Sequence, residues 1–172
     1  MNFSTKKITF LSIMLALMLV LATIERILPP FPMLPPQFGR IGLPNVIIMY
    51  MIFFLGKKEA FIMVILKAIF GLLMRGPTAG LLSLSGGLLS VGIIIFLWWV
   101  FKDKISYVSL SIAGAIGHNF GQLIVAGFLV QNWGLVVFYL PVLLIAGAIF
   151  GTVTGVFLKI FISRFDQKYW GW

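Results

Sequence analysis

The most constraining feature of this chain is a succession of long apolar runs, separated by short turns rich in charge, glycine or proline. A helix that crosses the hydrocarbon core of a bilayer needs ~20 mostly apolar residues. We therefore expect membrane spans at about residues 8–28, 41–55, 60–74, 79–101, 105–130 and 135–162. The predicted fold class is all-α, an integral membrane bundle of six transmembrane helices that residues 1–172 form as a single domain.

Composition supports lipid as the surrounding medium. Hydrophobic residues make up 61% of the chain and charged residues only 10%, whereas soluble domains carry about 25% charged residues. Too few polar side chains are left to cover a surface that faces water. We expect a multi-pass protein of the cell membrane, in contact with membrane lipid.

The basic residues predict the orientation of the bundle. The net charge is +9, but the lysines and arginines lie between the apolar runs, which favours membrane topology over nucleic-acid binding. With both termini cytoplasmic, the outer segments hold only Arg26, Arg40 and Arg75. The cytoplasmic segments then hold Lys6, Lys7, Lys57, Lys58, Lys102, Lys104, Lys159, Arg164 and Lys168. The second and third spans could instead form a re-entrant pair, which leaves four spans and the same sidedness.

Polar side chains inside the apolar runs are the first candidates for a binding site. A lysine at the centre of a membrane helix costs about 2.5–3.5 kcal/mol to insert, so Lys67 either holds a ligand or ion pair or extends to the membrane surface. His118 and Gln122 are four residues apart and share a helix face, with Asn119 beside them. These three side chains serve either ligand contact or hydrogen bonds between helices.

A second candidate group lies near the outer surface. It consists of Glu25, Arg26, Arg40, Asn45 and Arg75. These residues are either ordinary interfacial charges or an electropositive mouth that attracts an anionic solute. Arginine suits the second role because its planar guanidinium matches a carboxylate or phosphate.

Small residues at intervals of four predict close helix packing. Ser12 and Ala16 show this spacing in the first span, where the pair could instead be a docking face for a partner subunit. The packing positions in the later spans are Ser83 and Gly87, Gly117 and Gly121, and Gly147, Gly151 and Gly155.

The sequence offers little to an enzyme. It has no P-loop, no paired aspartates for magnesium, and no serine-nucleophile or zinc-protease motif. Its single histidine, His118, has no nearby carboxylate or cysteine, which leaves too few ligands for a metal. We expect no catalytic residues, no cofactor, no metal and no nucleic-acid partner.

Five segments carry a resemblance to a known family. They are GLPNVIIMYMIFFLGKKEAF, ILKAIFGLLMRG, SLSGGLLS, GAIGHNFGQLIVA and YLPVLLIAGAIFGTVTG. Together they resemble the Gx transporter family, which is also labelled heptaprenyl diphosphate synthase component I. That family is similar to the S components of energy-coupling-factor (ECF) transporters. Those components are six-helix proteins that capture a micronutrient outside the cell, while a coupling membrane subunit and two ATPases drive its release inside.

This resemblance implies a substrate-binding subunit. The pocket for a small anionic solute would be lined by Lys67, Asn45, His118, Asn119 and Gln122, with Arg75 at its rim. Arg40 and the proline-rich loop of residues 30–44 would form its lid. The family docks on its partner through an A-x-x-x-A face, to which Ser12 and Ala16 correspond only in degenerate form.

The sequence leaves two alternatives open. One is an accessory subunit of a heptaprenyl diphosphate synthase, although the aspartate-rich motif of prenyltransferases is absent. The other is a self-sufficient secondary transporter. The solute could be flavin, thiamine-like, or a precursor of quinones or isoprenoids.

Overall fold

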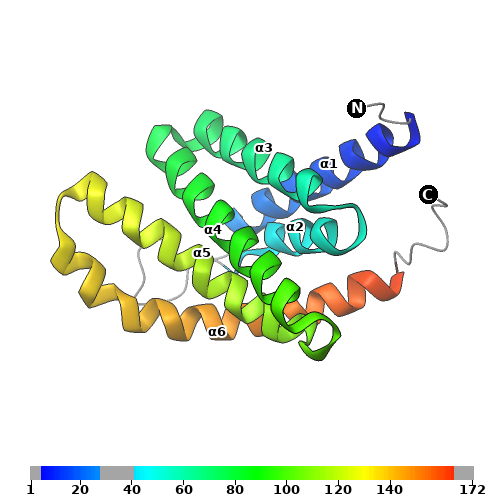
Figure 1. Cartoon of the computed structure of the whole chain (residues 1–172). Helices are drawn as coiled ribbons and strands as arrows, with labels where there is room; N and C mark the ends of the chain where they lie inside the picture. The colour runs from blue at the N-terminus through cyan, green and yellow to red at the C-terminus, as the bar shows by residue number, and fades with distance from the viewer. Residues whose placement is uncertain (1–4, 28–40, 165–172) are drawn as a thin grey trace.

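The structure is a computed structural model, and it describes residues 5–27 and 41–164. Its helices follow the predicted apolar segments, and the described residues contain no strand. The prediction of an all-α bundle is confirmed (Figure 1). The elements are α1 (Thr5–Ile27), α2 (Leu43–Phe54), α3 (Lys57–Arg75), α4 (Pro77–Phe101), the 3-10 turn η1 (Lys102–Lys104), α5 (Tyr107–Val130) and α6 (Trp133–Arg164).

Glycine and proline set the tight connections between the first helices. Gly42, Gly56 and Gly76 have φ angles of 84°, 136° and 86°, a region that glycine adopts without steric cost. Gly56 separates α2 from α3, and Gly76 separates α3 from α4. Pro77 then begins α4, where its missing N–H would have no helical partner in any case.

Successive helices run in alternating directions, so the bundle has two distinct ends. In Figure 1, the first residues of α1, α3 and α5 and the last residues of α2, α4 and α6 lie toward the right. We call this the lysine-rich end, because it carries Lys6, Lys7, Lys57, Lys58, Lys102, Lys104 and Lys159, together with Arg164. Arg26 and Arg75 lie at the opposite end, where α1 and α3 finish.

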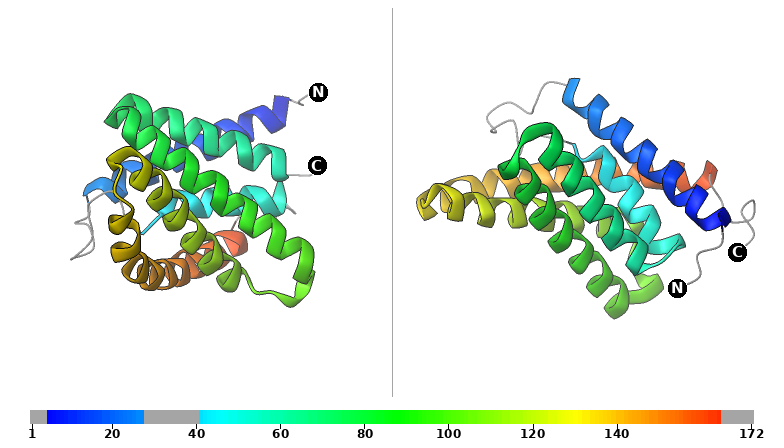
Figure 2. Two further views of the ribbon diagram at one scale, coloured as in Figure 1. Left: turned by 60° about the vertical axis from the view of Figure 1, so that its left-hand side comes forward. Right: turned by 90° about the horizontal axis from the view of Figure 1, so that it is seen from above.

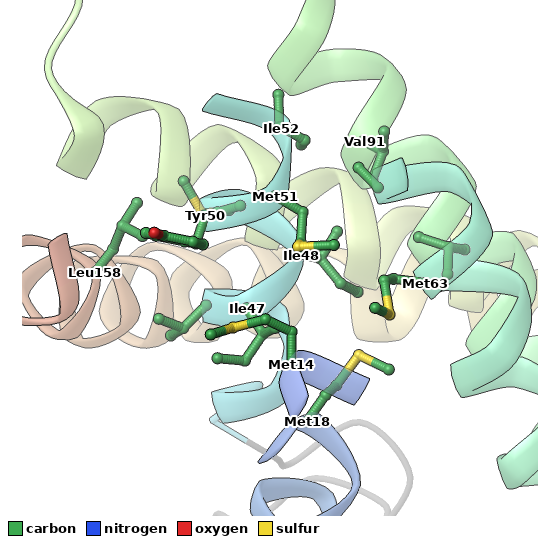
Figure 3. Close-up of a cluster of buried hydrophobic side chains, with 14 of the residues drawn as sticks. Met14, Met18, Ile47, Ile48, Tyr50, Met51, Ile52, Met63, Val91 and Leu158 are labelled. Carbon is green, nitrogen blue, oxygen red and sulfur yellow. The ribbon is translucent and has the colours of Figure 1, made fainter. Parts of the chain in front are cut away.

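The shortest helix, α2, forms the centre of the core. Its residues Val46–Ile52 are all buried. Met14 and Met18 of α1, Met63 of α3 and Leu158 of α6 pack around it (Figure 3). A helix of 12 residues is about 18 Å long, which is less than the ~30 Å hydrocarbon core. We therefore expect the polar start of α2 to lie below the membrane surface.

The outer helices present apolar side chains to their surroundings, as a membrane protein requires. Ile27, Leu73 and Phe138 are 81%, 76% and 74% exposed. Among the described residues, four helices, α1, α4, α5 and α6, are long and apolar enough to cross a membrane. α2 is too short, and α3 carries five charged residues, so full crossing by these two segments stays a prediction.

Glycines bring the last three helices into close contact. α4 packs on α5 and α5 on α6 as antiparallel neighbours (Figure 2). A Cβ atom added at Gly151 of α6 would lie 2.5 Å from the Cα of Ile112 in α5, and one at Gly155 would lie 2.8 Å from the Cα of Val108. These glycines therefore occupy positions where no side chain fits, as the four-residue spacing predicts.

Candidate functional site

A polar cleft lies at the end of the bundle opposite the lysine-rich end. It encloses about 80 Å³ and draws its walls from α1 to α5. All the predicted substrate-binding residues line it except Arg40, which lies outside the described residues. Its described lining is Ala22, Glu25, Arg26, Gly42, Pro44, Asn45, Lys67, Phe70, Gly71, Arg75, Ser83, His118, Asn119 and Gln122.

The ammonium group of Lys67 points into the bundle. Its Nζ donates a hydrogen bond of 2.7 Å to Oδ1 of Asn45, at the start of α2. Asn45 is held there by the turn at Gly42, whose carbonyl accepts the Asn45 N–H at 2.8 Å. Lys67 thus joins α3 to α2 inside the protein and does not extend to the membrane surface.

Glu25 caps α2 from the end of α1. Its side chain is 7% exposed, and its Oε1 accepts hydrogen bonds from the N–H of Gly42 and, at a longer 3.4 Å, from that of Leu43. Gly42 has no side chain to cap the helix, so a carboxylate from another helix takes that role. Glu25 also interacts electrostatically with Lys67.

The polar side chains of α5 line the cleft, and some of them also hold α5 against the neighbouring helices. Asn119 is buried, and its Nδ2 donates to the carbonyl of Leu143 in α6 at 3.1 Å, so this residue bonds two helices together. The ring of His118 packs on Gly86 of α4, where an added Cβ would lie 2.8 Å from it. The Nδ1 atom of His118 is buried and lies against the backbone of Gly86, with which the imidazole interacts.

Ser83 is a cleft residue that the sequence predicted only as a packing position. It is 4% exposed, and its Oγ has no hydrogen-bond partner among the described residues. Ser83 and Gly87 show the four-residue spacing that is typical of helix contacts. This spacing alone could not distinguish a packing residue from a residue that lines a binding site.

The charges of the cleft favour an anion. Three cationic side chains, Arg26, Lys67 and Arg75, line it together with a single carboxylate, that of Glu25. Hydroxyl, amide and imidazole groups complete the polar wall. Within the described chain, no group of three His, Asp or Glu side chains could hold a metal ion.

A second, apolar groove runs along α1 beside Ser12. It encloses about 270 Å³ between α1 and α3, and its lining is Ile8, Leu11, Ser12, Leu15, Glu59, Ile62, Met63 and Leu66. Ser12 and Ala16 are both exposed. At the lysine-rich end of this groove, Lys7 forms an ion pair of 2.5 Å with Glu59, which ties α1 to α3.

The ion pair perturbs Glu59, which lies just outside the predicted third span. Burial raises the pKa of the carboxyl group. The hydrogen bond from Lys7, a backbone hydrogen bond and the charges of Lys7 and Lys58 act in the opposite direction and together prevail, so the pKa lies below its ordinary value of 4.5.

The family model described as heptaprenyl diphosphate synthase component I matches residues 14–161. The chain belongs to this family. The matched residues contain all five segments that carry the resemblance to this family. They also include every described residue of the polar cleft. Neither the comparison with curated proteins nor the comparison with solved structures gave a match.

Proposed function

We propose that this chain is the substrate-binding membrane subunit of an ATP-driven importer of the ECF type, and that the polar cleft holds a small anionic solute. The observation that carries the proposal is the position of Lys67. Its ammonium lies inside the bundle, hydrogen-bonded to Asn45, in a cleft with an excess of positive charge. Charged groups at membrane depth are costly and usually serve binding or transport.

The groups in the cleft suit binding better than catalysis. The only hydroxyl among its described residues, that of Ser83, has no hydrogen-bonded base, whereas a serine nucleophile needs one. The only carboxylate, that of Glu25, already accepts backbone N–H groups. We therefore propose no enzymatic activity for the chain.

The distribution of charge supports an outward-facing cleft. Cytoplasmic segments of membrane proteins carry the excess of lysine and arginine, which makes the lysine-rich end cytoplasmic. The cleft then faces the outside of a multi-pass protein in the cell membrane. Release of the solute inside requires energy, and the chain has no P-loop, so a coupling membrane subunit and two ATPase subunits would supply it. The exposed face of α1 with Ser12 and Ala16 is the proposed docking site.

Mass spectrometry of small molecules retained by the purified protein tests the binding role. Wild-type protein should retain an anionic solute, and Lys67→Ala and His118→Ala should retain much less of it. Lys159→Ala is the matched control, because Lys159 is exposed near the lysine-rich end of α6. Equal retention by all four proteins would refute the cleft as the binding site.

Co-purification tests the proposed partners separately. The ECF proposal predicts that the two ATPases and the coupling subunit are recovered with the chain. Recovery of homo-oligomers alone would favour a self-sufficient transporter.

The description of the family favours one second candidate, an accessory subunit of heptaprenyl diphosphate synthase. In that case, the purified chain should stimulate prenyl chain elongation and should retain no solute.

A further inference from the structure

The start of α2 is an anion-binding position that one of the protein's own carboxylates occupies. The first N–H groups of a helix have no partner within the helix and, with the helix dipole, attract negative charge. Here the N–H groups of Gly42 and Leu43 donate to Glu25, which comes from the neighbouring helix α1. The carboxylate of Glu25 therefore stands where the carboxylate or phosphate of a ligand could stand.

A further atom of the same cleft indicates that a ligand belongs there. The Oγ of Ser83 is buried on the cleft wall without a hydrogen bond to the described residues. Buried polar atoms in native proteins are nearly always paired. This hydroxyl group suggests that a bound molecule completes its hydrogen bonding.

Charge identifies Glu25 as the side chain that an incoming anion would displace. It is the only acidic residue among the described residues of the cleft, and it interacts electrostatically with Lys67. An incoming anion would be attracted by Lys67 and Arg75 and repelled by Glu25. The cleft encloses about 80 Å³, well below the ~300–1,000 Å³ of ordinary ligand sites, so an anion and the Glu25 side chain would compete for the same small space.

We propose that the anionic group of the solute, a carboxylate or phosphate, replaces Glu25 at the N–H groups of Gly42 and Leu43, beside Lys67 and the Ser83 hydroxyl. The inference rests on the proposed function and names the part of the solute that the cleft recognises. The exchange frees the end of α1 from α2. Because Ser12 and Ala16 lie on α1, binding of the solute would change the position of the helix that carries the proposed docking face.

Titration with inorganic phosphate and with acetate, at constant ionic strength in chloride, tests the exchange on the purified full chain. The Glu25→Gln side chain keeps the shape and an acceptor oxygen but loses the competing charge. We expect the Glu25→Gln protein to bind at least one of the two anions about tenfold more tightly than the wild type. The reason is that Glu25 occupies the site in most wild-type molecules, whereas the site would be free in most molecules of the variant. Ser83→Ala should bind that anion roughly tenfold more weakly, because it loses a hydrogen bond to a charged group.

Glu59→Gln is the matched control, since it removes the other buried carboxylate among the described side chains, at the start of α3 and far from the cleft. Its affinity should equal that of the wild type. Unchanged or weaker binding by Glu25→Gln, or binding of neither anion, overturns the exchange. The proposed function fails separately, if Lys67→Ala retains the natural solute as the wild type does.

A second measurement leaves Glu25 in place. The chain has no cysteine, so spin labels can be attached at Ile24→Cys in α1 and Leu73→Cys in α3, both of which are exposed positions. The distribution of distances between the labels should shift when the anion that binds is added. A distribution that stays unchanged at saturation also overturns the exchange.

Discussion

Replacement of Gly151 by alanine tests the packing of α6 on α5. The added Cβ would lie 2.5 Å from the Cα of Ile112, 2.9 Å from its nitrogen and 3.0 Å from the carbonyl oxygen of Ser111. These are backbone atoms, which cannot rotate aside as the end of a side chain can. Ordinary contact begins at 3.4 Å, so the two helices must separate locally by about 0.9 Å from the present 2.5 Å.

The separation should lower the free energy of unfolding by about 2–4 kcal/mol. Overpacking of a close-packed interior costs about 1–3 kcal/mol. The same movement would lengthen the nearby hydrogen bond between Ser111 and Thr154 from 2.8 Å to about 3.7 Å, beyond the range of a hydrogen bond. Hydrogen bonds between membrane helices contribute about 0.6–2 kcal/mol each.

Unfolding in mixed micelles by increasing sodium dodecyl sulfate, followed by tryptophan fluorescence, measures this change. Gly92→Ala in α4 is the matched control, because its added Cβ meets no atom within 4 Å. Alanine has the higher helix propensity by about 1 kcal/mol, so this control should be as stable as the wild type or slightly more stable. If Gly151→Ala and Gly92→Ala unfold at the same proportion of sodium dodecyl sulfate, the close approach of α5 and α6 is wrong.

Three other outcomes follow from contacts in the structure. Gly86→Ala would place a Cβ 2.8 Å from the ring of His118, and it should reduce solute retention at least about tenfold by displacing that ring, whereas Gly92→Ala should not. Asn119→Ala removes the hydrogen bond between α5 and the Leu143 carbonyl of α6 and should lower stability in the micelle assay by about 0.5–1.5 kcal/mol; full stability would contradict the bond. The pKa of Glu59 is below its ordinary value of 4.5, so its pair with Lys7 stabilises the fold above pH 4.5, and this stability is lost as the pH falls through the lower, folded pKa. Comparison of wild type and Glu59→Gln across pH 3–7 should show a difference of up to about 1 kcal/mol near neutral pH that disappears in acid, and a constant difference would refute the pair.

The helices could be predicted because their signals are local. Apolar runs bounded by Gly56, Gly76 and Pro77 are visible in the sequence, and lipid leaves few other folds open to such a chain. Lys67 and His118 could also be singled out as candidates, since a polar side chain in an apolar run requires a reason wherever the helix packs, and both residues line the polar cleft.

The remaining features depend on which helices meet. Glu25 caps α2 through Gly42, which lies 17 residues further along the chain, and Lys7 pairs with a residue 52 positions away. Neither partner is marked in the sequence by spacing. Ser83 has a small side chain that serves a helix contact as well as a binding site, so only its unpaired hydroxyl in the folded protein separates the two roles.

The shortness of α2 has an electrical consequence. From Asn45, only about 15 Å of helix remains to the turn at Gly56, so a water-filled cleft above it would concentrate the transmembrane voltage across this thin remainder. One elementary charge that crosses the whole voltage changes in energy by about 2.3 kcal/mol per 100 mV. In the proposed importer, an electrically negative cell interior would oppose the inward step of an anion from this depth, and ATP hydrolysis by the proposed partner subunits would have to overcome that field.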